Sequence, residues 1–278
     1  LDILDSTSFC PLEIRESALV FQGEYWEIEI NKTRIVIIGA TSAIAVQCAR
    51  IWVQQDLIDL TLIGRDTARL KKIADDLGIR SPDSLINVFE ADFLEPKSIK
   101  SVSRKIIENG NVDIVLIAQG ALIEQEHCQQ DLDSCNHSLL INAVSPILFA
   151  EAFANHFEEV GRGHLALIGS VAGDRARKSN YIYGSSKNTL GFFVKGLHHR
   201  FAGTNIRVSI IKPGPTDTPM TAKSKTKNMK LARVEVVAAD IVKGIEKGKL
   251  VVYTPWKWRL IMFVIKIIPR FIFHKMNL

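Results

Sequence analysis

Residues 34–45 read Arg-Ile-Val-Ile-Ile-Gly-Ala-Thr-Ser-Ala-Ile-Ala. The β-branched apolar run up to Ile38 predicts a strand buried on both faces, and the small residues after Gly39 lead into a helix predicted at 42–55. A strand that enters a helix through a small-residue turn is the opening unit of a parallel α/β fold. An ordinary tight turn is the alternative at this one position, so the rest of the chain decides.

The same strand–helix unit repeats along most of the 278 residues. Such alternation predicts an α/β protein with a Rossmann-like, doubly wound parallel sheet in a single domain. We assign 31–254 to this domain, 1–30 to an N-terminal extension and 255–278 to an apolar, basic C-terminal tail. Strands are predicted at 34–38, 58–63, 85–90, 112–117, 164–169, 206–211 and 249–252, and helices near 42–55, 66–77, 96–109, 132–159, 182–202 and 234–247.

The turn after the first strand is suited to a dinucleotide. Small residues let a pyrophosphate approach the backbone and the helix N-terminus, so Gly39, Thr41, Ser42 and Ile44 are candidate cofactor contacts. Arg65 follows the second strand, where an arginine suits the 2′-phosphate of NADP and an acid suits the free ribose hydroxyl. NADP(H) is therefore favoured, and the neighbouring Asp66 keeps NAD(H) open.

Ser170, Tyr183 and Lys187 form the chemical constellation. Ser170 closes a predicted strand, and Tyr183 and Lys187 lie four residues apart on one face of the helix predicted at 182–202. A cation one turn away should lower the pKa of the phenol, which could then protonate a carbonyl oxygen as hydride reaches its carbon. Ser170 could hold that oxygen in place by a hydrogen bond.

These motifs resemble the classical short-chain dehydrogenase/reductase family over residues 32 to about 250. The resemblance implies a catalytic tetrad of Asn142, Ser170, Tyr183 and Lys187, with Asn142 holding a water and Lys187 also binding the nicotinamide ribose. It further implies cofactor contacts after the third, fourth and sixth strands. These are Asp92 at the adenine, Phe93, Gly120, Pro213, Gly214, Thr216 and Thr218.

Two departures from the family pattern indicate a particular group within the family. Ala43 and Ala45 stand where the family commonly has glycines, and the fourth strand ends in Gln119-Gly120. Together with the runs at 170–175, 179–181 and 253–256, they resemble the decaprenylphosphoryl-2-keto-erythro-pentose reductases. This resemblance implies hydride transfer to the 2-keto group of a polyprenyl-phosphate-linked pentose. Reduction or oxidation of another carbonyl or alcohol, and a non-catalytic nucleotide sensor, remain the alternatives.

The net charge of +5 is concentrated in two short segments. Residues 221–233 carry Lys223, Lys225, Lys227, Lys230 and Arg233 without an acid, beside the expected substrate mouth. Residues 255–278 also carry five bases and no acid, within an apolar run flanked by Trp256 and Trp258. The run is too interrupted to span a bilayer, and it predicts a helix lying on a membrane surface, with a buried helix or a dimer contact as alternatives.

The near-neutral body argues against nucleic acid as a partner. Four cysteines without metal-ligand spacing predict reduced thiols and no metal site. With an acidic N-terminus that lacks a signal-peptide pattern, we expect a cytoplasmic protein, peripheral at the inner face of the cytoplasmic membrane. The expected partners are a small-molecule or lipid-linked sugar substrate, the membrane surface through the tail, and further copies of the chain.

Overall fold

The computed structural model describes residues 18–22, 25–29, 32–222 and 231–276. Its centre is a seven-stranded sheet in the order β5-β4-β3-β6-β7-β8-β9, with every neighbouring pair parallel. The chain reverses its winding direction between β3 and β6, as in Rossmann-like folds. The strands are β3 (Thr33–Ile38), β4 (Ile58–Gly64), β5 (Leu85–Glu90), β6 (Ile114–Ile117), β7 (Arg162–Ile168), β8 (Asn205–Pro213) and β9 (Val251–Thr254).

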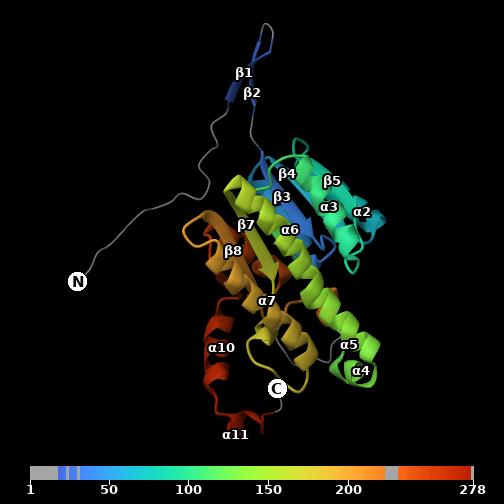
Figure 1. Cartoon of the computed structure of the whole chain (residues 1–278), viewed down its shortest axis with the longest axis vertical. Helices are drawn as coiled ribbons and strands as arrows, with labels where there is room; N and C mark the ends of the chain where they lie inside the picture. The colour runs from blue at the N-terminus through green and yellow to red at the C-terminus, as the bar shows by residue number, and fades with distance from the viewer. Residues whose placement is uncertain (1–17, 23–24, 30–31, 223–230, 277–278) are drawn as a thin grey trace, which may run out of the picture.

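Helices cover both faces of this sheet (Figure 1). One face carries α3 (Pro96–Glu108), α6 (Ser145–Val160) and α7 (Tyr181–Arg200), and the other carries α1 (Ala43–Gln55), α2 (Thr67–Arg80) and α9 (Val234–Glu246). Alternate residues of β3 enter the two cores, with Val36 and Ile38 on the first side and Ile35 and Ile37 on the second. This explains the continuous apolar strands, and it confirms the predicted α/β class.

The long helix predicted at 132–159 is present but interrupted. Helix α5 (Leu132–Leu139) passes into a π-helical segment (Leu140–Val144) before α6 begins. Pro146 has no N–H to bond the carbonyl four residues earlier, and the backbone N–H of Ser145 instead bonds Leu140, five residues back. The interruption therefore has a local cause, and Asn142 lies inside it.

Residues 132–160 are long and apolar enough to cross a membrane by length and composition, and more than half of their most apolar 18-residue window is buried within the fold. Phe149, Phe153 and Phe157 recur at helical spacing and are completely buried against the sheet. This apolar character is that of a core helix.

Further elements flank the body. Residues 18–29 contribute an antiparallel hairpin, β1 (Ala18–Gln22) with β2 (Tyr25–Glu29), a separate two-stranded sheet that the sequence pattern did not predict. Short helices α4 (Gln125–Gln130) and α8 (Pro219–Ala222) lie in the connections, and the tail forms α10 (Lys257–Ile267) and α11 (Arg270–Phe273). Of the predicted thiols, Cys48, Cys128 and Cys135 are free, and Cys10 lies outside the described residues.

Candidate active site

A cavity of about 920 Å³ opens at the carboxyl ends of the parallel strands, where the winding reverses. This is the position at which doubly wound sheets bind ligands. Asp92 and Asn142 are the predicted site residues that do not line it. The predicted residues that do line it are Gly39, Thr41, Ser42, Ile44, Arg65, Phe93, Gly120, Ser170, Tyr183, Lys187, Pro213, Gly214, Thr216 and Thr218.

Gly39 is required at the nucleotide end. Its φ is +77°, and a Cβ at this position would lie 2.5 Å from the backbone nitrogen of Gln119. Ala43 and Ala45 belong to α1, and no described residue other than glycine has a positive φ, so neither alanine is strained. The first turn of α1 has no side-chain cap from Ser42, which leaves N–H groups open toward the cavity. These features fit a dinucleotide pyrophosphate.

Arg65 and Arg69 form a basic corner beside this turn. Both line the cavity, and Arg69 donates from Nη2 to the carbonyl of Thr41 at 3.1 Å. Asp66 is already engaged as the N-cap of α2, because its carboxylate accepts the backbone N–H of Arg69 at 2.9 Å. Asp66, the acid that left NAD(H) as an alternative cofactor, therefore has a structural role. Arg69 is a second arginine beside Arg65, and the sequence pattern did not predict it.

Ser170 and Tyr183 meet at the opposite end of the cavity. Ser170 follows β7 and accepts the backbone N–H of Ala172 at 3.1 Å, and it lines the same cavity as Tyr183 in the first turn of α7. Gly173 packs so tightly on α7 that a Cβ there would lie 2.7 Å from the Lys187 carbonyl carbon. The Asn188 amide also donates to the Gly173 carbonyl at 2.7 Å. The serine and tyrosine are thus held by one rigid junction.

Lys187 lies on the same helix face as Tyr183, as the spacing predicted. Its ammonium is buried, donates to the Ile168 carbonyl at 2.9 Å and lies 5.8 Å from the centroid of the Tyr183 ring. Burial lowers the pKa of Lys187 to about 8. Burial also raises the pKa of Tyr183 to about 12, although the Ser170 hydrogen bond acts in the opposite direction. The expected lowering of the phenol pKa is absent here, because desolvation outweighs the distant cation.

Asn142 supports the cavity wall from behind. It is completely buried, its Oδ1 accepts the N–H of Ala121 at 3.0 Å, and its Nδ2 donates to the carbonyls of Ala121 and Ser138. A Cβ on Gly120 would lie 2.9 Å from this Oδ1 and 3.5 Å from the Lys187 ammonium. Glycine at 120 therefore allows the wall to approach both side chains.

The Asp92 carboxylate is hydrogen-bonded within its own loop and does not line the cavity. Its Oδ1 accepts the backbone N–H of Leu94 at 2.8 Å, and its neighbour Phe93 is the residue that reaches the cavity. Tyr181 is half exposed and does not line the cavity; its hydroxyl accepts the Gln129 amide at 3.3 Å. Tyr181 therefore links α4 to α7, and it lies outside the cavity in which a general acid would act.

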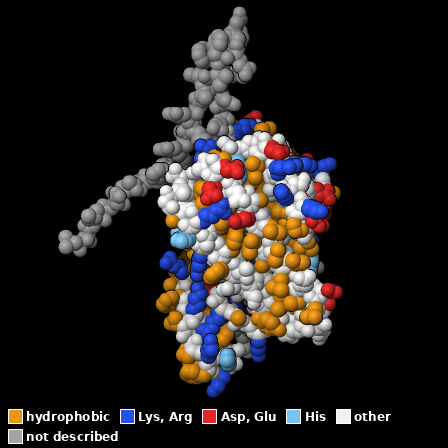
Figure 2. All heavy atoms as spheres, viewed as in Figure 1, with side chains coloured by type: hydrophobic (Ala, Val, Ile, Leu, Met, Phe, Trp, Pro, Cys, Tyr) orange, Lys and Arg blue, Asp and Glu red, His pale blue; other side chains and the backbone are white. Residues whose placement is uncertain are grey.

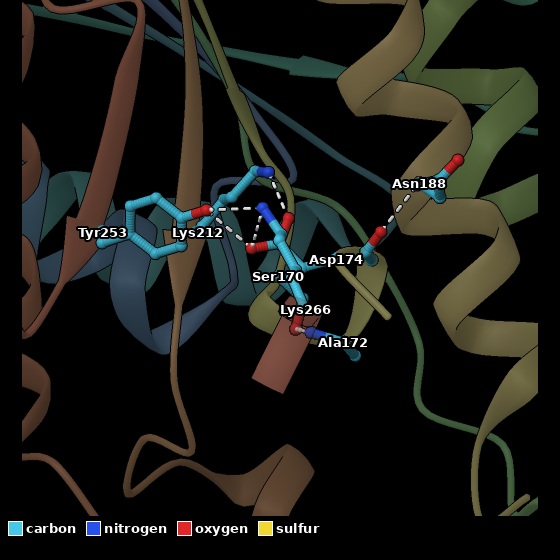
Figure 3. A network of polar contacts seen from close by, with 8 residues as sticks. Ser170, Ala172, Asp174, Asn188, Lys212, Tyr253 and Lys266 are labelled. Carbon is cyan, nitrogen blue, oxygen red and sulfur yellow. Dashed lines mark hydrogen bonds and ion pairs between the residues drawn. The ribbon is translucent and has the colours of Figure 1, made fainter. Parts of the chain in front are cut away.

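A buried carboxylate joins the segment after Ser170 to the C-terminal tail. Figure 3 shows the side chains of Lys212, Tyr253 and Lys266 converging on Asp174. Lys212 pairs with Oδ1, while the Tyr253 hydroxyl donates to Oδ2 at 2.6 Å and the Lys266 ammonium lies 3.2 Å from it. Burial raises the pKa of Asp174, but the hydrogen bonds and the two cations outweigh it, so the pKa lies below its ordinary value. The sequence reading missed this cluster because its members lie far apart in the chain.

The tail packs beside the site. The Trp258 indole rests so close to Gly214 that a Cβ there would lie 1.9 Å from its Nε1, and Met262 one turn later is fully buried. Arg175 donates to the carbonyls of Ile265 and Lys266 and lies 3.8 Å above the Phe273 ring. Of the basic segment predicted at the mouth, Arg233 pairs with Glu235, and Lys223, Lys225, Lys227 and Lys230 lie outside the described residues.

The sequence reading also missed Arg177, Ser179 and Asn180 as cavity residues. All three stand between Ser170 and Tyr183 in the sequence, and a segment bracketed by two site residues has to pass close to the site. That bracketing was the available signal.

The fold and the cavity together define a nucleotide-dependent oxidoreductase. A family model described as short chain dehydrogenase matches residues 33–229. An uncharacterized oxidoreductase of Streptomyces coelicolor is 30% identical over 249 residues, which cover 87% of this chain and 95% of that protein.

Solved structures give the same fold. A short-chain dehydrogenase from Sphingobium yanoikuyae, in complex with NADPH, aligns with a TM-score of 0.72 at 23% identity, covering 86% of this chain and 97% of that one. The bulky-bulky ketone specific alcohol dehydrogenase from Comamonas testosteroni aligns with a TM-score of 0.73 at 22% identity, covering 86% and 96%. The chain belongs to the short-chain dehydrogenase/reductase family. It is an NAD(P)-dependent oxidoreductase acting on carbonyl or alcohol groups.

Proposed function

We propose that this enzyme reduces the 2-keto group of a pentose carried on a polyprenyl phosphate. The placement of Ser170, Tyr183 and Lys187 together in the wall of one cavity, with Lys187 one helical turn from Tyr183, is the observation that carries the reductase chemistry. The substrate class is supported by the resemblance of residues 170–175, 179–181 and 253–256 to reductases of that kind. An apolar, basic tail beside the cavity also suits a lipid-borne substrate.

Each site residue has a chemical role in this proposal. The bound nicotinamide supplies hydride to the keto carbon. Tyr183, kept protonated by its raised pKa, donates its hydroxyl proton to the keto oxygen, and Ser170 holds that oxygen by a hydrogen bond. Lys187 binds the ribose and stabilises the phenolate that remains, while Asn142 fixes the wall at Gly120–Ala121 that Lys187 approaches.

We favour NADPH as the reductant. Arg65 and Arg69 line the corner that a 2′-phosphate would occupy, and Asp66 is engaged in capping α2. Among the residues that line the cavity, we assign Thr41, Ser42 and Ile44 to the pyrophosphate, Phe93 to the base, and Gly214, Thr216 and Thr218 to the nicotinamide region. Asp92 contributes by shaping the loop that presents Phe93.

The tail is suited to bind an anionic lipid surface at the cytoplasmic side of the membrane. Leu260, Phe263, Val264 and Ile267 recur at helical spacing on the exposed face of α10, opposite the buried Met262. Figure 2 shows Lys and Arg side chains among the hydrophobic ones over this part of the molecule. In this proposal residues 31–254 carry the chemistry and 255–278 bring it to the membrane.

The test of the proposed function is NADPH consumption with a polyprenyl-phosphoryl 2-keto-pentose. Tyr183→Phe should lower kcat by about 10²- to 10⁴-fold, the usual contribution of a general acid, and should bind NADPH as the native enzyme does. Tyr181→Phe is the matched control, because the same atom is removed two residues away and outside the cavity. It should keep turnover within about twofold. Turnover retained by Tyr183→Phe, or a native enzyme that prefers keto groups without a phosphate, would contradict the proposal.

A further inference from the structure

Arg177 is a cation in the wall of the cavity that has no partner among the described residues. It belongs to the segment between the Ser170 turn and α7, and it lines the same cavity as Ser170 and Tyr183. Its Nε is buried, and its guanidinium forms no hydrogen bond or ion pair with any residue that the structure describes. Burial lowers the pKa of Arg177. Because a buried guanidinium nitrogen without a partner is costly, its place in a cavity wall needs an explanation.

Asn180, three residues further along the chain, also has a buried polar atom without a hydrogen-bond partner among the described residues. The Asn180 side chain also lines the cavity, its Oδ1 is buried without a hydrogen-bond donor, and it does not cap α7, the helix that follows it. Two residues from one short segment therefore present an unused cation and an unused acceptor to the same space. A ligand with an anionic oxygen and a hydroxyl group would satisfy both.

The other charges of the described cavity wall have their own roles. Arg65 and Arg69 stand after β4 at the nucleotide end, Lys187 is bonded to Ile168, and Asp66 caps α2. Arg177 comes from the segment after β7, which is separated from β4 by two strands, β3 and β6. It is therefore the cation that the cofactor does not account for, and no described acid in the wall opposes it.

We propose that Arg177 and Asn180 form a phosphate-ester subsite, in which the Arg177 guanidinium binds a phosphate oxygen of the substrate and Asn180 Oδ1 accepts a neighbouring hydroxyl. This inference rests on the proposed function and names the contact that selects a phosphorylated keto-sugar. The planar guanidinium matches two phosphate oxygens at once, which an ammonium does not. The ligand oxygens satisfy the buried nitrogen, so binding relieves the desolvation cost.

Binding to the NADPH-loaded full chain tests the subsite without turnover. The probes are geranyl phosphate, inorganic phosphate and geraniol, titrated by calorimetry; NADPH fills the nucleotide end, so its arginines do not compete. Arg177→Gln should weaken geranyl phosphate binding about tenfold or more and leave geraniol unchanged. Lys178→Gln is the matched control, because Lys178 is exposed, adjacent and outside the cavity wall. It should change neither affinity by more than about twofold.

A second readout separates binding from architecture. Removing an unpartnered buried cation should leave the Tm of Arg177→Gln unchanged or raise it. Arg177→Lys should recover only part of the phosphate affinity. Equal geranyl phosphate binding by the native chain and Arg177→Gln, or a Tm several degrees lower in that variant, would overturn the subsite.

Kinetics distinguish failure of the subsite from failure of the proposed function. The substrates are a 2-keto-pentose bearing a geranyl phosphodiester and its methyl glycoside. Arg177→Gln should raise KM about tenfold for the first alone, with kcat nearly unchanged. Phosphate binding through Arg177 without turnover of either compound would reject the keto-pentose assignment and keep the subsite. Equal KM increases for both compounds would reject the subsite and keep the reductase. Inorganic phosphate bound through Arg177 as tightly as geranyl phosphate would show that the phosphate itself is recognised.

Discussion

At the scale of single residues, burial moves two pKa values of the site in opposite directions. The pKa of Tyr183 rises to about 12 and that of Lys187 falls to about 8. Desolvation disfavours the charged form of either group, so one phenomenon produces both shifts. For a reductase the result is useful, since the acid keeps the proton that it must deliver. Lys187, by contrast, loses its charge within an accessible pH range.

We predict that kcat/KM for NADPH, which reports the free enzyme, is level below pH 8 and falls about tenfold per pH unit above it. The charge on Lys187 is lost as pH rises through its folded pKa of about 8. Its unfolded value is 10.5, so between pH 8 and 10 the unfolded chain binds more protons, and this group makes the free energy of unfolding rise with pH. Thermal scans at each pH therefore separate titration from denaturation. A rate that stays level to pH 10 would contradict the assignment.

At the scale of elements, the junction between β7 and α7 positions the chemistry, and α10 is attached to it. Asp174 follows Ser170 by four residues and receives Lys212 from β8, Tyr253 from β9 and Lys266 from α10. Arg175 adds bonds to the carbonyl end of α10. Helix α10 is thus held by the same segment that carries Ser170 and Arg177.

We predict that Lys266→Met weakens the attachment of α10 to the rest of the fold. The Asp174–Lys266 pair is half exposed on the lysine side, so its loss should cost at most about 1 kcal/mol and speed amide exchange in α10 by about two- to fivefold. Lys257→Met changes the same residue type on the same helix, where the lysine forms no ion pair with any residue in the described ranges. Hydrogen-exchange mass spectrometry of residues 257–267 should separate the two variants. Equal protection in both would show that the pair does not hold the helix.

At the scale of the whole molecule, α10 is apolar on two faces. The inner face, with Trp258 and Met262, packs on the catalytic body, and the outer face leaves Leu260, Phe263 and Ile267 more than half exposed. Exposed apolar side chains gathered in this way mark an interaction surface. In the proposed function this surface lies on anionic lipid, to which Lys257 and Arg259 on the same helix would be attracted.

We predict that replacing Leu260, Phe263 and Ile267 together by Ser weakens binding to anionic vesicles about tenfold or more. The inner face is untouched, so NADPH turnover with a water-soluble ketone should remain within about twofold. Cosedimentation with anionic and zwitterionic vesicles measures the binding, and Met262→Leu is the control for the inner face. A change from dimer to monomer by light scattering, without any native vesicle binding, would assign this face to a second copy.

Local pattern predicted most of the fold. The seven strands of the sheet and the principal helices lie where the apolar runs and helical spacing placed them, because each is continuous in sequence and buries its own apolar face. The interrupted helix around Asn142 and the hairpin at residues 18–29 were missed. The first depends on the missing N–H of Pro146, and the second lies within residues 1–30, where the sequence pattern predicts an extension and no element.

The sequence by itself determined the α/β class, the nucleotide turn and the Ser170–Tyr183–Lys187 set, since those features rest on spacing along the chain. Tertiary structure alone decided which groups are desolvated and which are paired. In the folded chain Asp66 caps α2, the tail is attached at Asp174 through Lys266, and Arg177 in the cavity wall has no partner among the described residues. Burial and pairing arise between segments that are distant in sequence, and a one-dimensional pattern does not contain those distances.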